Sequence, residues 1–183
     1  MTGLSWSRRN VFLVAALSVA ALLAAVRSMD GSQVNPGIAP VAEHPDLFAG
    51  QAPCPQSGTA LANGRRAEEL GLLRADRYAY SPSDGVRAVE RFQVAEACYR
   101  SIGAATDADR VRRIRSDLSS RVSSDYAAAR LNLVNALQQE RWSDALSESR
   151  RLLLLTDHLR RHDYVDWLKN DIGRIAARAS VQP

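Results

Sequence analysis

The stretch LVNALQQERWSDALSESRRLLLL, residues 133–155, carries the pattern that decides the fold. Apolar residues lead into it with a spacing of three or four, the period of one face of an α-helix, at Tyr126, Ala129, Leu133 and Leu137. Residues 140–143, three of which are polar, then interrupt the pattern, and a second apolar series follows. The stretch therefore predicts two helices joined by a short turn.

The same spacing extends over residues 60–179, where Ala, Leu, Arg and Glu predominate and only Pro82 interrupts. It predicts an all-α domain over residues 61–180, with no strand. We expect about six antiparallel helices, near residues 61–76, 85–102, 107–122, 125–140, 143–156 and 163–179. The third and fourth can join into one long helix, because Ser123 and Ser124 are weak helix breakers.

An internal repeat is compatible with this pattern. Aligning Ala88 with Ala145 places Val89 on Leu146, and a helix precedes and follows each segment. Two three-helix units of about 60 residues each are one interpretation. Their sequence identity is low, so a duplication remains open.

Residues 129–157 resemble a tetratricopeptide repeat (TPR), a helix-turn-helix unit that stacks side by side. The resemblance rests on small or apolar residues in the first helix, an aromatic at the turn and a small residue where the helices cross: Leu133, Ala136, Leu137, Trp142, Ala145 and Leu146. Glu140 stands where the family prefers Gly, Ser149 replaces a large residue, and no Pro ends the unit. The resemblance implies a TPR-like helical array that binds peptides or proteins without catalysis.

The N-terminal region contains the apolar run VFLVAALSVAALLAAV, residues 11–26, which Arg8 and Arg9 precede by one or two residues. Positive charges before such a run keep that end in the cytoplasm. We expect a cytoplasmic tail at 1–10 and a transmembrane signal anchor at 11–27 in the inner membrane. The helical domain would then lie in the periplasm or outside. A cleaved signal peptide is the alternative, since the run is short for a span of roughly 20 residues.

Residues 28–60 contain five of the chain's 7 prolines and several glycines, which prevent helix or sheet from propagating. They predict a flexible tether with a reach of roughly 30 Å. The 2 cysteines of the chain, Cys54 and Cys98, are expected to form a disulfide, because thiols outside the cytoplasm are usually oxidised. The alternative is a buried Cys98 and a free Cys54.

No motif indicates catalysis: a nucleophile elbow, a phosphate-binding glycine loop and a zinc-protease motif are all missing from the sequence. We expect no enzyme and no cofactor. His158, His162 and Asp166 are spaced by four residues, but a turn predicted between the histidines argues against a metal site.

The net charge is +4, and acidic residues are interleaved with the arginine clusters. This interleaving argues against nucleic-acid binding, which would need basic residues gathered on one face. The sequence instead predicts a non-catalytic, membrane-anchored adaptor or accessory subunit that binds partner proteins at the membrane. Candidate partner contacts are Arg112, Arg115, Tyr78 and Tyr80. The alternatives are a secreted soluble binding protein and a helical domain that binds a small ligand.

Overall fold

The computed structural model describes residues 43–50, 52–159 and 161–181. In this part of the chain all regular secondary structure is helical, as predicted. Its five helices are α2 (Ala60–Arg77), α3 (Pro82–Ser101), α4 (Ala105–Gln138), α5 (Trp142–Leu155) and α6 (Asp163–Ala179). Among the described residues, no helix combines the length and the apolar character that a membrane span needs. The predicted tail, the predicted anchor at 11–27 and the first part of the tether lie outside the described residues.

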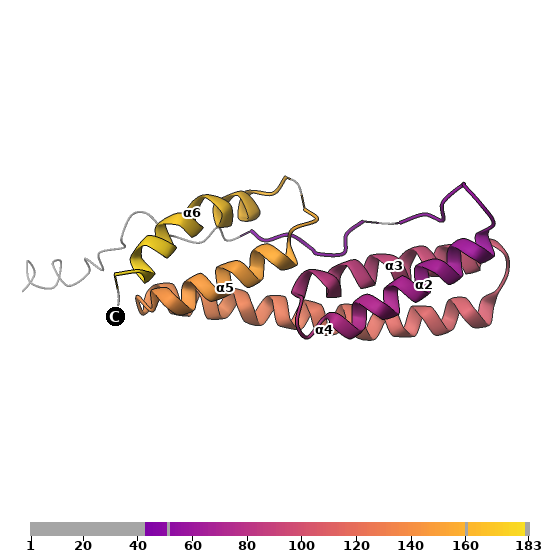
Figure 1. Ribbon diagram of the computed structural model, residues 1–183, viewed down its shortest axis with the longest axis horizontal. Helices are drawn as coiled ribbons and strands as arrows, with labels where there is room; N and C mark the ends of the chain where they lie inside the picture. The colour runs from indigo at the N-terminus through magenta and orange to yellow at the C-terminus, as the bar shows by residue number, and fades with distance from the viewer. Residues whose placement is uncertain (1–42, 51, 160, 182–183) are drawn as a thin grey trace, which may run out of the picture. The chain divides into compact units, whose positions relative to one another are not determined.

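Each helix packs against the next one along the chain. The connections at 78–81, 102–104 and 139–141 are short, so consecutive helices form hairpins. Figure 1 shows α3 and α5 one after the other along α4, with α3 beside its first half and α5 beside its second half. Helix α4 is therefore shared by two groups of helices, α2 and α3 at one end and α5 and α6 at the other.

The third and fourth predicted helices are joined into α4, the alternative that the sequence had left open. Buried positions keep the same helical period across the polar stretch at 123–125. They are Val111, Leu118, Val122, Tyr126, Ala129 and Leu133. Ser123 and Ser124 lie on the exposed face. A serine costs only about 0.5 kcal/mol in a helix, which is less than the gain from burying one apolar side chain.

Three glycines allow α2 and α3 to approach closely. A Cβ atom at Gly71 would stand 2.7 Å from the ring of Phe92, and one at Gly64 would stand 3.0 Å from Tyr99. The third is Gly85, whose missing side chain makes room for the Tyr78 ring. Aromatic rings thus occupy the space that glycine leaves, and the two helix backbones pack closely.

Replacing Gly71 by Ala is expected to destabilise the fold by about 1–3 kcal/mol, because the fully buried Phe92 ring has no room to move away. Gly173→Ala in α6 is the matched control, since nothing lies within 4 Å of its Cβ position. There the same change is expected to stabilise by about 0.5–1 kcal/mol through helix propensity. Urea unfolding followed by circular dichroism measures both, and equal effects would contradict the close-packing explanation.

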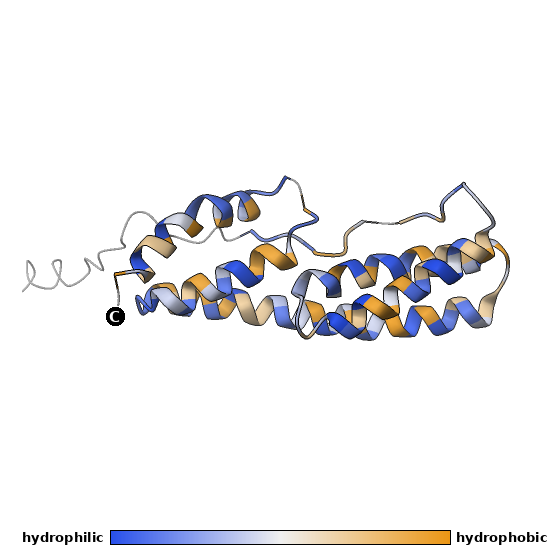
Figure 2. Cartoon of the chain, in the orientation of Figure 1, coloured by the Kyte–Doolittle hydropathy of each residue, from blue (hydrophilic) through white to orange (hydrophobic). Residues whose placement is uncertain are grey.

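The hairpin of α4 and α5 buries most of the residues that carried the TPR resemblance. Leu133, Ala136, Trp142 and Ala145 are buried, whereas Leu146 is half-buried. The guanidinium of Arg178 in α6 lies 4.5 Å from the centre of the Trp142 ring. Figure 2 shows apolar and hydrophilic residues alternating along each helix. In α6, Leu168 is buried and Trp167 is half-buried.

Candidate peptide-binding groove

A non-helical segment before α2 lies against the helices. We call residues 43–50 and 52–54 the strap. Its side chains alternate: His44 and Asp46 are exposed, Pro45 is buried, and Leu47 is only 6% exposed. Such alternation is typical of an extended chain with one face on a surface. The strap therefore binds to the helical domain much as an extended peptide would.

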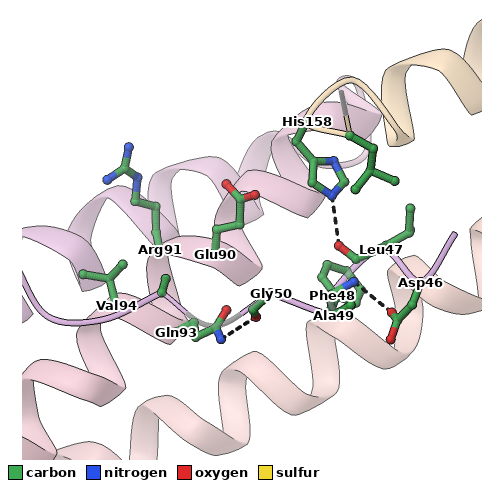
Figure 3. Close-up of a pocket in the computed structure, with 12 residues that line it drawn as sticks. Asp46, Leu47, Phe48, Ala49, Gly50, Glu90, Arg91, Gln93, Val94 and His158 are labelled. Carbon is green, nitrogen blue, oxygen red and sulfur yellow. Dashed lines mark hydrogen bonds between the residues drawn. The ribbon is translucent and has the colours of Figure 1, made fainter. Parts of the chain in front are cut away.

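Two side chains of the helical domain hold the main chain of the strap (Figure 3). Gln93 Nε2 in α3 donates to the carbonyl oxygen of Gly50 at 2.9 Å, and His158 Nε2 donates to the carbonyl of Leu47 at 2.9 Å. Within the strap, Asp46 Oδ1 accepts from the backbone N–H of Phe48 at 2.9 Å and so shapes the turn. Because both external hydrogen bonds go to backbone carbonyls, they do not depend on the strap's own side chains.

A groove remains between the strap and the helices. One hollow along it has a volume of about 380 Å³ and is lined by the strap, by α3 and by the connection from α5 to α6. Figure 3 shows Glu90, Gln93 and Val94 on the α3 side and His158 opposite Leu47. A second hollow of about 560 Å³ follows along α3 past Ala97. The two hollows share Ala52 and Gln93 in their linings. We call the surface formed by α3 residues 90–97 and residues 158–159 the strap groove.

The C-terminal end of the strap is fixed covalently. Cys54 and Cys98 form a disulfide with their Cα atoms 4.8 Å apart, as the sequence predicted. Cys98 is fully buried in α3, whereas Cys54 is half-exposed. The described part of the predicted tether, residues 43–50 and 52–59, thus has no helix or strand but is attached to the helical domain, and its last residue, Ala60, already begins α2.

The two arginines predicted as partner contacts are engaged in ion pairs. Arg115 Nε lies 3.0 Å from Glu96 Oε2, and Glu96 is 4% exposed and also pairs with Arg100 at 2.6 Å. Arg112 is exposed and pairs with Asp109 at 2.9 Å. Arg115 therefore compensates a buried carboxylate, and only Arg112 lies on the surface with its charge largely accessible.

The two predicted tyrosines have different environments. Tyr78 packs on Gly85, and its hydroxyl donates to Asp125 in α4. Burial is the main cause that raises the pKa of Tyr78 above its usual value. Tyr80 is 91% exposed. Asp125 lies ten residues beyond Arg115 in α4, about 15 Å along the helix axis, so the four candidates do not form one compact surface.

A buried carboxylate links the first three helices. Glu68 in α2 accepts a hydrogen bond from the Tyr99 hydroxyl of α3 at 2.9 Å. It also accepts from both terminal nitrogens of Arg110 in α4, of which Nη2 lies 3.2 Å from Glu68 Oε2. The hydrogen bond from Arg110 lowers the pKa of Glu68. Burial, followed by the bond to Glu68, raises the pKa of Tyr99 to about 12. The cluster ties the α2–α3 hairpin to the first half of α4.

This cluster predicts a loss of stability in acid. Because the pKa of Glu68 is lower in the folded state, its contribution is complete above the unfolded value of 4.5 and disappears as the pH falls below it. Glu68→Gln is expected to destabilise by about 1–2 kcal/mol at pH 7, and the difference from wild type should shrink toward pH 3. Urea unfolding at several pH values tests this. A difference that stayed constant with pH would rule out the ionised carboxylate as its source.

The histidines that are spaced by four residues serve separate structural purposes. His158 binds the strap, whereas His162 caps α6 by accepting from the backbone N–H of Tyr164 at 3.1 Å. In the part of the chain that the structure describes, no group of three His, Cys, Asp or Glu side chains is placed to hold a metal ion.

The residues that form the strap groove were not predicted from the sequence. Pro45 and Leu47 lay in a stretch assigned to the tether, Gln93 carried no motif, and His158 was considered only as a metal ligand. The signal that was available is the alternation in His44-Pro45-Asp46-Leu47, which places two apolar residues on one face of an extended chain.

Comparisons of this chain with protein-family models, with curated proteins and with solved structures found no match. The groove must therefore be interpreted from its own geometry.

Proposed function

We propose that this protein is a non-catalytic, membrane-anchored envelope protein whose helical domain binds partner proteins as an adaptor or accessory subunit. The observation that carries the proposal is the strap groove, in which side chains of α3 and of the α5–α6 connection bind the backbone of an extended segment. A surface that binds one extended segment through its backbone has the features needed to bind another. The TPR-like features at 129–157 support the same class of function.

The strap also limits how far the domain can work from the bilayer. If residues 11–27 are the anchor, only residues 28–42 separate it from the attached strap. At 3.3–3.6 Å per residue, this stretch spans at most about 50 Å. The proposed partners are therefore proteins in or at the inner membrane, reached from its periplasmic or outer side.

Binding of a small ligand is the second candidate function. The cavity of about 380 Å³ lies within the range of ligand pockets. Its lining combines apolar side chains such as Phe48 with the half-buried carboxylate of Glu90. A ligand of this kind predicts a concentration-dependent increase in melting temperature, which a purely protein-binding domain would not show. A secreted, soluble form with a cleaved signal is the alternative for location.

The test is affinity purification of the full-length protein from native membranes in mild detergent, with intact mass measured on the product. We expect an uncleaved chain with stoichiometric membrane proteins. Val94→Glu, which places a charge in the strap groove, should abolish their recovery. Leu131→Glu is the control, because Leu131 is 72% exposed on α4, away from the groove. Tyr80→Ala and Arg112→Ala test the contacts predicted from sequence.

Two results would contradict the proposal. A product that lacks its first 25 to 30 residues and is recovered alone from the soluble fraction would exclude the anchor. Partner recovery that is equally unaffected by Val94→Glu and Leu131→Glu would exclude the strap groove as the binding surface.

A further inference from the structure

We infer that the strap groove is a docking site for an extended Pro-x-Leu segment of a partner protein, and that the strap is its intramolecular competitor. This inference rests on the proposed function and names the class of partner segment. The strap, which is a segment of this chain, shows what kind of segment the helical domain binds. In the strap Pro45 and Leu47 are buried, and the residue between them is exposed.

Recognition of the strap has a general part and a specific part. The general part is the pair of donors, Gln93 and His158, whose target carbonyls are three residues apart. Any extended peptide presents such carbonyls. The specific part is the burial of Leu47, which lines the groove, and of Pro45, which lies two residues earlier on the same face of the strap but does not line the two hollows. A partner segment with the same two apolar residues would satisfy both.

The strap fills this surface incompletely. Hollows of about 380 Å³ and about 560 Å³ remain beside it along α3. Ala49 and Gly50 are exposed and contribute little side-chain area, although they pass over the groove. A Cβ atom added at Gly50 would meet nothing within 4 Å, so larger side chains at this position would point into open space. A partner segment whose side chains enter the two hollows themselves would bury more surface than the strap does, and so would compete with it.

The attachment of the strap determines how difficult this exchange is. The disulfide at Cys54 and the nearby start of α2 keep the strap close to the groove, which gives it an effective concentration in the millimolar range. Upstream of Cys54, the strap is held by the two external hydrogen bonds and by its buried side chains. Exchange therefore requires release of the part around Leu47, while the disulfide stays intact.

The test measures binding of a labelled peptide, EHPDLFAGQAP (residues 43–53), to the full-length protein in mild detergent by fluorescence anisotropy. Leu47→Asp in the protein should weaken the strap and raise the apparent affinity about 30-fold, the equivalent of about 2 kcal/mol for burying one Leu side chain. Gln93→Ala added to Leu47→Asp should lower the affinity again. The peptide with the same Leu-to-Asp change should not bind.

Equal binding of the peptide to wild type and Leu47→Asp would overturn the inference, and so would equal binding of the two peptides. Circular dichroism checks that Leu47→Asp keeps its helices. If it does not, Leu47→Ala takes its place, with a smaller expected gain of about 10-fold. Because the peptide assay needs no native partner, its result is independent of the purification experiment: recovered partners without peptide binding would leave the proposed function intact and reject this inference.

Discussion

Reduction of the Cys54–Cys98 disulfide is expected to lower the free energy of unfolding by about 3–4 kcal/mol. The two cysteines are 44 residues apart, and their bond encloses α2 and most of α3. In the unfolded chain the bond removes the freedom of this whole loop, and the native state is stabilised by the same amount in the chain-entropy description. This is a large share of the 5–15 kcal/mol that typically holds a domain together.

Urea unfolding of the full-length protein in detergent, with and without dithiothreitol, measures the effect. The Cys54→Ala/Cys98→Ala variant should behave like reduced wild type and should not respond to dithiothreitol, which controls for effects of the reductant elsewhere. Alanine is used because Cys98 is fully buried and a serine there would add an unpaired hydroxyl. Identical unfolding of oxidised and reduced protein would show that the bond does not constrain the unfolded chain.

Phe92→Ala is expected to destabilise the helical domain by about 3–5 kcal/mol. The ring is completely buried in α3 and fills the space opposite Gly71 of α2. Its removal leaves a cavity in the interface between α2 and α3, and the stiff hairpin has little freedom to collapse into it. The loss therefore combines the transfer of the ring and the cost of the cavity.

Leu131→Ala is the matched control, because Leu131 is 72% exposed and its loss should change stability by less than about 0.5 kcal/mol. Urea unfolding monitored at 222 nm would compare the two variants at equal detergent concentration. A cost for Phe92→Ala as small as that for Leu131→Ala would mean that the α2–α3 contact contributes little to stability.

Much of the fold could be predicted from local patterns. The sixth predicted helix, 163–179, matches α6, and the others agree within a few residues apart from the joining of two into α4. Helix α3 begins at Pro82, three residues before the predicted start, because proline is well suited to a first helical position. Whether α4 would be continuous could not be decided locally, since it depends on the burial of Val122 and Tyr126 against neighbouring helices.

Much less of the candidate site could be predicted from the sequence. Arg115 and Tyr78 were chosen as exposed contacts, but the fold places Glu96 beside the first and Asp125 beside the second. Those partners lie 19 and 47 residues away, since they belong to other helices. Sequence spacing within one helix gives no information on such pairs.

By itself, the sequence determined the helical character of the domain and the non-helical stretch before it, because both follow from local periodicity and composition. It predicted the disulfide with a free Cys54 as the alternative, and the structure shows the bond. Only the tertiary structure decided that Leu47 lies in a groove and that His158, 111 residues away, binds its carbonyl. The physical reason is that a groove is formed by surfaces of separate elements, and it exists only after those elements have packed together.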